Sequence, residues 1–263
     1  MYKTSQSSGN RSSLFAMRKK RHEKLQITNK YHGTKLLENI EVSLPAYTEY
    51  LCQLVSNSLV TLPEDKNSMV PIIDFGAGLG TICCLLRDRT QRQIDCVEID
   101  VNLASILKAR NFRVFSDISK ADPTNFIFSI NVIEHIKDDT GTIKEIYGHL
   151  KDGGLFVVYV PAFMQLFTNL DSSVGHYRRY SKKELVKKIE DSGFEVTDVR
   201  YVDCLGGIST FLLRLLGSRF QMWSLSPRRL AFFDKRVFPL SVLMDKLFFY
   251  RFFGKNLFIV AKK

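Results

Sequence analysis

The middle of the chain alternates between short apolar segments and longer segments with helical periodicity. The predicted strands are residues 70–75, 93–99, 112–115, 126–131 and 155–160, and the predicted helices between them are 79–87, 102–110 and 140–150. Strands that are apolar at nearly every position are typical of a parallel sheet that is buried on both faces. The alternation therefore predicts an α/β fold, with a doubly wound sheet between two layers of helices.

The predicted domain extends on both sides of this region. Residues 1–25 are rich in Ser, Lys and Arg and are predicted to be a disordered basic arm, residues 28–60 are predicted as helices, and 26–263 as one domain. Ser181 and Glu184 form a capping-box pattern that starts another helix. Strands are predicted at 194–202 and 256–261.

The formal net charge of +11 is concentrated at the two ends of the chain. Residues 1–30 contain eight Lys or Arg and one acid, and residues 201–263 contain eleven and three, whereas the middle is mildly acidic. Basic ends favour an anionic partner such as a membrane surface, a lipid-linked substrate or RNA. Because the middle is acidic and carries no recognisable RNA-binding module, nucleic acid is the least favoured of these partners.

The five cysteines are odd in number and include no CxxC pair. This pattern predicts reduced, buried thiols in a cytosol-like compartment, with neither disulfides nor a zinc site, and no metal ion is expected. The N-terminus lacks the apolar core of a secretory signal. We therefore expect a cytoplasmic location, with peripheral contact at the inner face of a membrane.

The first candidate binding feature is a glycine-rich turn after the strand at 70–75. The strand runs into Asp74-x-Gly76-x-Gly78-x-Gly80, and a predicted helix follows. Glycines permit a tight turn and a close approach of the backbone to a ligand, and the helix N-terminus then points toward that ligand. The spacing differs from the G-x-G-x-x-G of dinucleotide-binding proteins. An ordinary strand–helix connection is the alternative.

Two acids follow the next two predicted strands. Glu98 ends the strand at 93–99, where a carboxylate can accept two hydrogen bonds from a ribose. Asp117 follows the third strand, where it could reach an adenine amino group. Each could also be an acid on a solvated loop, but their positions one and two strand–helix units after the glycine turn favour binding.

Polar residues also follow the fourth strand, in the stretch Asn131 to His135. Ligands of open parallel sheets bind at the carboxyl ends of the strands, so Asn131, Glu134 and His135 are expected beside the glycine turn. His135 is a candidate proton acceptor because the ordinary pKa of histidine is near neutral. A packing or capping role for His135 carries equal weight.

Together these motifs resemble those of class I S-adenosylmethionine-dependent methyltransferases, in order and spacing over about residues 65–202. The resemblance implies S-adenosylmethionine as the cofactor and a Rossmann-like doubly wound seven-stranded sheet, mostly parallel with an antiparallel last strand. The Asn-Val-Ile-Glu-His stretch is similar to the branch that methylates mostly small molecules. The cofactor-binding residues that the resemblance implies are Asp74, Phe75, Gly76, Ala77, Gly78, Gly80, Glu98, Ile99, Asp117, Ile118, Asn131 and Val132.

The segment from Asp171 to Ser181 resembles a Gly-His-x-Arg-Arg-Tyr segment of bacterial methyltransferases associated with surface polysaccharides and lipids. The expected substrate-binding residues are Glu134, Tyr177, Arg178, Arg179 and Tyr180, since the two arginines could bind phosphate and the tyrosines could stack on a ring. His176 is the second candidate for removing a proton. The alternative is a structural loop whose arginines pair with acids such as Asp171.

Residues 204–255 are an apolar, Phe-rich helical insertion before the last strand, with scattered Arg and Lys. The insertion could contact a membrane, form a dimer interface or lid, or pack as an ordinary helical cap. The expected function is methyl transfer to a hydroxyl of a sugar, lipid-linked or apolar compound. A quinone-like or secondary-metabolite acceptor, an RNA acceptor and a non-catalytic S-adenosylmethionine-binding module are the alternatives, and the sequence leaves the oligomeric state open.

Overall fold

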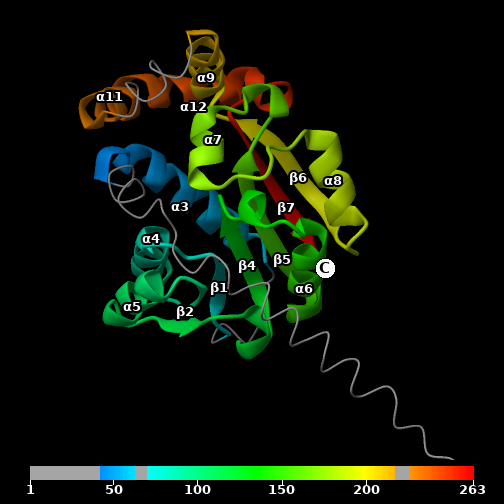
Figure 1. Cartoon of the computed structure of the whole chain (residues 1–263). Coiled ribbons are helices and arrows are strands. Elements are labelled where there is room, and N and C mark those ends of the chain that lie inside the picture. Colours follow the sequence, from blue (N-terminus) through cyan, green and yellow to red (C-terminus); the bar gives the residue numbers. More distant parts are fainter. Residues whose placement is uncertain (1–41, 63–69, 217–225) are drawn as a thin grey trace, which may run out of the picture. The chain divides into compact units, whose positions relative to one another are not determined.

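The computed structural model describes residues 42–62, 70–216 and 226–263 (Figure 1). All of them belong to a compact unit that spans Gly33–Lys263. The predicted basic arm at 1–25 and the first part of the predicted N-terminal helices lie outside the described residues.

A seven-stranded sheet forms the centre of the protein, with strand order β3-β2-β1-β4-β5-β7-β6. Strands β1 to β5 pair in parallel, and β7 is antiparallel to both of its neighbours, β5 and β6. The predicted Rossmann-like sheet with an antiparallel last strand is confirmed. The strands are β1 (Ile72–Phe75), β2 (Ile94–Val97), β3 (Arg113–Phe115), β4 (Thr124–Ile130), β5 (Leu150–Pro161), β6 (Glu195–Val202) and β7 (Asn256–Lys262).

Helices cover both faces of the sheet (Figure 1). Apolar side chains of α3 (Pro45–Val60), α4 (Thr81–Thr90) and α5 (Val101–Ala109) pack on one face. Those of α6 (Asp139–His149) and α8 (Lys182–Glu190) pack on the other. Successive strand residues alternate between the two cores: Phe156 and Val158 face α6 and α8, whereas Val157 faces α3. This explains why the strands are apolar at nearly every position.

The structure differs from the prediction most at the start of β5 and at the bounds of α4. Strand β5 begins at Leu150, five residues before the predicted start, because Leu150 already pairs with Thr124 before an irregularity in the β4–β5 register. The helix predicted at 79–87 is shifted to Thr81–Thr90, since Gly80 at its N-terminus has a left-handed backbone conformation. Four of the five cysteine thiols are buried as predicted, whereas Cys84 is partly exposed.

The described part of the insertion before β7 is mostly helical. It contains α9 (Cys204–Leu216), α11 (Pro227–Phe232), a π-helical segment (Phe233–Val237) and α12 (Phe238–Leu247). A buried aspartate ties the end of the insertion back to its start. Asp245 accepts hydrogen bonds from the backbone N–H groups of Asp203 and Cys204 at the start of α9, at 2.6 and 3.0 Å. No described helix is long and apolar enough to cross a membrane.

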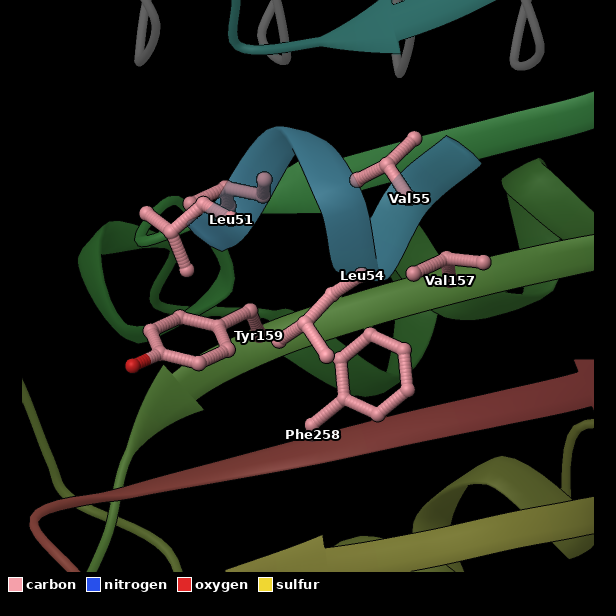
Figure 2. Close-up of a pocket in the computed structure, with 7 residues that line it drawn as sticks. Leu51, Leu54, Val55, Val157, Tyr159 and Phe258 are labelled. Carbon is pink, nitrogen blue, oxygen red and sulfur yellow. The ribbon is translucent and has the colours of Figure 1, made fainter. Parts of the chain in front are cut away.

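A narrow apolar pocket lies between α3 and the sheet (Figure 2). Its lining consists of Leu51, Leu54, Val55, Ile130, Val157, Tyr159 and Phe258. None of these residues is a candidate site residue, and only Tyr159 carries a polar side-chain group. We interpret this pocket as a packing gap in the core beneath α3.

Candidate active site

The glycine turn between β1 and α4 has the strained geometry that glycine allows. Gly76, Gly78 and Gly80 have φ values of 87°, 56° and 77°, which residues with a Cβ rarely adopt. A Cβ on Gly76 would lie 2.3 Å from Cγ2 of Val132, in the segment that follows β4. The loops after β1 and β4 are therefore in direct contact. They meet where the strand order reverses, which is where open α/β sheets bind ligands.

Glu98 is buried at the end of β2 and connects two loops. Its Oε2 accepts a hydrogen bond from the Gly78 backbone N–H, and its Oε1 accepts one from the Asp100 N–H, both at 2.9 Å. Burial raises the pKa of Glu98, and these two hydrogen bonds oppose that shift. The Ile99 backbone N–H also hydrogen-bonds this carboxylate. Acceptor capacity still remains, because a carboxylate has about four lone-pair sites.

The structure places Asp74 differently from the prediction. Its carboxylate is buried on the face covered by α4, where Oδ2 accepts a hydrogen bond from the Cys83 thiol at 3.0 Å. Burial raises its pKa to about 7. The Cys83 sulfur lies 3.6 Å from that of Cys96. This carboxylate therefore has its partner inside the core, not at the carboxyl end of the sheet where a cofactor contact was predicted.

The other predicted cofactor residues after β2 and β3 differ in exposure. Ile99 is 65% exposed beside Glu98, so its side chain is available to a flat ligand. Asp117 caps a 3-10 turn by accepting a hydrogen bond from the Ser119 N–H at 2.8 Å. The Ile118 side chain is buried in the core, which leaves only its backbone for a ligand contact.

A tyrosine from α3, which sequence reasoning missed, lies near the end of β4. The hydroxyl of Tyr47 hydrogen-bonds that of Tyr159 at 3.0 Å, and the side chain of Asn131 also hydrogen-bonds Tyr47. Asn131 is exposed and has a φ of 54°. No signal in the sequence around Pro45 could have placed Tyr47 here, since α3 reaches the sheet only through tertiary packing.

Glu134, His135 and His176 come together beside this edge of the sheet. Glu134 and His135 lie in a 3-10 turn (Ile133–His135), and His176 follows α7 (Asn169–Val174). The Tyr177 N–H donates to the Glu134 carbonyl at 2.9 Å, which holds the two loops together. The two imidazole rings lie edge to face, with centroids 4.5 Å apart. The folding thus joins both predicted catalytic histidines and one predicted substrate residue into one cluster.

Burial shifts the pKa values of two members of this cluster, Glu134 and His135. It raises the pKa of Glu134 to about 8, although the residue's own backbone N–H and the charge of Arg179 act in the opposite direction. Burial and the charge of His176 lower the pKa of His135 to about 4. His135 is therefore a neutral imidazole at neutral pH.

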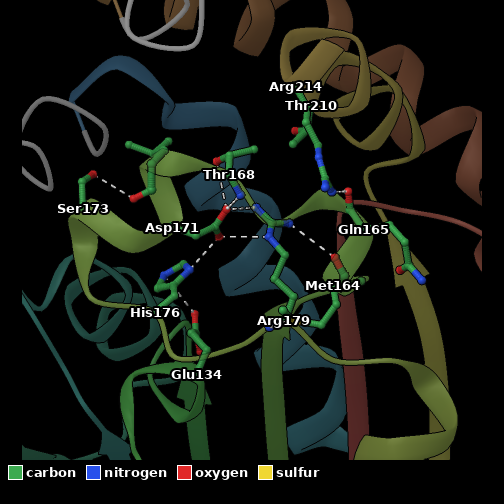
Figure 3. Close-up of polar contacts among 12 residues, drawn as sticks. Glu134, Met164, Gln165, Thr168, Asp171, Ser173, His176, Arg179, Thr210 and Arg214 are labelled. Carbon is green, nitrogen blue, oxygen red and sulfur yellow. Dashed lines mark hydrogen bonds and ion pairs between the residues drawn. The ribbon is translucent and has the colours of Figure 1, made fainter. Parts of the chain in front are cut away.

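The loop from Asp171 to Tyr180 is built around a buried ion pair (Figure 3). Asp171 is bound through both oxygens by Arg179, with Nε–Oδ1 at 2.9 Å and Nη2–Oδ2 at 3.1 Å, and its Oδ1 also contacts Nδ1 of His176 at 2.8 Å. Burial alone would raise the pKa of Asp171, but the His176 hydrogen bond and the Arg179 charge hold it below its ordinary value.

This geometry corrects three predicted substrate residues. The guanidinium of Arg179 is only 6% exposed and is occupied by Asp171 and the Ala162 carbonyl. Tyr180 is fully buried, with its hydroxyl on Asp139 at 2.8 Å, and Arg178 pairs with the same aspartate at 2.7 Å. The structural alternative therefore holds for Arg178, Arg179 and Tyr180, whereas Tyr177 remains half exposed.

The sequence matches the methyltransferase-domain family over residues 46–199, which is more than half of the chain. The chain belongs to this methyltransferase family. A curated relative from Mycolicibacterium smegmatis, named as a probable S-adenosylmethionine-dependent methyltransferase, is 26% identical over 136 residues. The match covers 48% of this chain and 52% of the relative, so it spans about half the length of that protein.

Solved methyltransferases share the fold. A SAM-dependent methyltransferase from Thermotoga maritima is 18% identical, with a TM-score of 0.56 over 89% of this chain and 97% of the other. The mycolic acid cyclopropane synthase CmaA1, solved with SAH and CTAB, is 13% identical, with a TM-score of 0.52 over 81% and 83%. The comparisons thus confirm the methyltransferase family that the motifs predict, and with it the enzyme class and the cofactor of that family.

Proposed function

We propose that this methyltransferase transfers a methyl group from S-adenosylmethionine to a hydroxyl of a small lipid-linked or otherwise apolar acceptor. One observation carries the proposal. The glycine turn after β1 and the segment after β4 that leads to Glu134 and His135 touch through Gly76 and Val132. Donor-side and acceptor-side residues therefore adjoin at the reversal of strand order.

The donor side fits the cofactor. A side chain at Gly76 would collide with Val132, and the positive φ of Gly78 disfavours one there. Glu98 keeps acceptor capacity for a ribose hydroxyl beyond its bonds to Gly78, Ile99 and Asp100. Ile99 offers an exposed apolar surface to an adenine ring. When bound, S-adenosylmethionine supplies a methyl group that its positively charged sulfur already activates. We propose that these residues hold the donor, together with Ala77, Asp117, Asn131 and Val132.

The acceptor side can take up a proton. His176 is fixed by Asp171 through Nδ1, so its Nε2 points toward Glu134 at 3.8 Å (Figure 3). A carboxylate that orients an imidazole in this way is a familiar arrangement for a general base. His135 is a weaker candidate, because its lowered pKa makes it a poor proton acceptor. We propose that the acceptor hydroxyl loses its proton at this cluster, with the half-exposed Tyr177 beside it.

The insertion favours an apolar acceptor at an anionic membrane surface. Helix α9 exposes Ile208, Phe211, Leu212, Leu215 and Leu216, which recur on one face with helical spacing. All three acids after residue 200, Asp203, Asp234 and Asp245, are buried. The exposed charges of the described part of the insertion are therefore all basic. Apolar side chains beside exposed arginines and lysines are typical of helices that lie on anionic membranes.

The activity is tested by methyl transfer from labelled S-adenosylmethionine into a membrane-containing extract, followed by partition between butanol and water. Gly78→Val serves as the blank, because a β-branched residue is disfavoured at a φ of 56°. We expect label in the butanol phase with the wild-type protein only. Label confined to the water phase would contradict the apolar acceptor, and no labelled product would contradict methyl transfer.

The membrane surface is tested by co-sedimentation with phosphatidylcholine vesicles with and without phosphatidylglycerol. Leu215→Asp places a charge on the exposed face of α9, and Val60→Asp places one at an exposed apolar residue of α3. We expect binding to anionic vesicles that Leu215→Asp weakens at least about tenfold, since burying one leucine is worth about 1.5–3 kcal/mol. Equal binding by both variants would contradict this surface.

A further inference from the structure

The cluster of Glu134, His135 and His176 has the composition of a metal site. One ligand atom from each side chain lies within 4.8 Å of the other two. In a tetrahedral site with bonds of about 2.1 Å, ligand atoms are about 3.4 Å apart, so small side-chain rotations would close the triangle. Metal binding is not expected from the sequence, because His176 lies forty-one residues after His135 and only the fold joins them.

Both histidines are oriented as metal-binding histidines are. Nδ1 of His176 is bound to Asp171, whose carboxylate is itself fixed by Arg179 and by the N–H and hydroxyl of Thr168. The ring of His135 hydrogen-bonds the backbone of Gly175. Metal-ligating histidines almost always use their second ring nitrogen on a carboxylate or a backbone carbonyl in this way.

Glu134 is the independent observation that points to a ligand. Its side chain is fully buried, and apart from a contact with its own N–H neither carboxylate oxygen has a hydrogen-bond partner in the described part of the chain. Leaving a buried carboxyl group without partners is costly, and buried polar groups are normally hydrogen-bonded or bound to metals. Nε2 of His176 lies 3.8 Å from Oε1 of Glu134, which is beyond hydrogen-bond distance.

We propose that Glu134, His135 and His176 bind one divalent transition-metal cation of the zinc type, with Asp171 and the Gly175 backbone as the supporting shell. Two imidazoles and one carboxylate suit Zn²⁺ and its neighbours, whereas Mg²⁺ and Ca²⁺ prefer oxygen ligands alone. Three protein ligands leave a coordination position open, as in catalytic zinc sites.

The role of the cation rests on the proposed function. An acceptor hydroxyl that coordinates the cation loses its proton to water more readily. Its oxygen then forms the new bond to the methyl carbon, while the bond between that carbon and the donor sulfur breaks and leaves its electron pair on sulfur. The cation would thereby replace His176 as the group that activates the hydroxyl.

The experiment measures metal binding directly on the full chain after treatment with EDTA and dialysis. Co²⁺ is titrated while its visible d–d absorption is recorded, and Zn²⁺ binding is measured by calorimetry. Glu134→Gln and His176→Asn each remove one ligand, and His149→Asn removes a histidine outside the cluster. Circular dichroism and thermal melting confirm that each variant is folded.

We expect one cation per wild-type chain, unchanged binding in His149→Asn and at least tenfold weaker binding in both cluster variants. No saturable binding would overturn the proposal. So would equal binding by folded cluster variants, which would locate the metal on other histidines or thiols. Methyl transfer is measured separately, so cation binding without transfer would refute the proposed function alone, and transfer without cation binding would refute this inference alone.

Discussion

The carboxylate of Asp234 accepts a hydrogen bond from the backbone N–H of Tyr47 at 2.8 Å, across 187 residues of sequence. It accepts a second from the N–H of Ala46 at 2.9 Å. Both donors belong to the first turn of α3, where backbone N–H groups have no partner within the helix. The insertion before β7 thus completes the helix that brings Tyr47 to the candidate active site.

Replacing Asp234 should weaken the whole domain. Asp234→Ala leaves two partly buried N–H groups without their acceptor, so we expect the free energy of unfolding to fall by about 1–2 kcal/mol. Urea unfolding followed by circular dichroism measures the loss. Asp88→Ala, at an exposed aspartate of α4, should change it by less than about 0.5 kcal/mol. An equal loss in both variants would contradict the capping role.

A methyl group on Gly76 should damage the donor site. In Gly76→Ala the new Cβ would lie 2.3 Å from Cγ2 of Val132 at a φ of 87°, so the turn must shift. We expect the dissociation constant for S-adenosylmethionine, measured by calorimetry, to rise at least about tenfold. The matched control is Gly148→Ala, where a Cβ meets no atom within 4 Å. Unchanged affinity in Gly76→Ala would remove the turn from the binding site.

The negative charge of Glu98, and not only the shape of its side chain, should be needed for S-adenosylmethionine binding. In Glu98→Gln the amide NH₂ replaces one acceptor and must face the N–H of Gly78 or of Asp100. A lost hydrogen bond to a charged group is worth about 1.5–3 kcal/mol, which corresponds to about 10–150-fold weaker S-adenosylmethionine binding. Glu195→Gln, at an exposed glutamate of β6, is the control. Binding by Glu98→Gln at the wild-type level would argue against contact with the donor.

Asp74 should make stability depend on pH. Burial raises its folded-state pKa to about 7, whereas its ordinary value is 3.8. The folded protein therefore holds this proton more tightly than the unfolded chain, and stability is lost as pH rises from about 4 to 7. Asp74→Asn removes that loss and keeps an acceptor for Cys83. Relative to wild type, we expect the variant to be more stable in urea at pH 8 than at pH 5. A pH-independent difference would be inconsistent with the raised pKa.

Lysine should not be able to replace the guanidinium group of Arg179 without a loss of stability. Its Nε and Nη2 bind the two oxygens of Asp171, a geometry that a single ammonium cannot reproduce. We expect Arg179→Lys to lower the free energy of unfolding by at least about 1 kcal/mol. Arg178→Lys should cost less, because Lys188 also binds Asp139, at 2.9 Å. Thermal melting of the two variants measures the difference. A lower melting temperature for Arg178→Lys than for Arg179→Lys would contradict this prediction.

The elements of this fold could be read from local periodicity. The apolar strands around Ile73 and Phe128, the amphipathic helix after Ser181 and the glycines of the turn each carry their signal within a few residues. Burial on both faces of a parallel sheet requires such strands, and a positive φ requires glycine. The strands, the helices between them and the position of the glycine turn therefore followed from local sequence, whereas the seven-stranded sheet was implied by the family resemblance.

Only the tertiary structure decided which polar side chains face a ligand. Arg179 and Tyr180 read as substrate contacts, yet Asp171 and Asp139 draw them into the interior. Glu134 and His176 meet because two loops far apart in sequence share a hydrogen bond through Tyr177. A charged side chain is buried or exposed according to the partner that folding brings to it, and that partner leaves no local pattern.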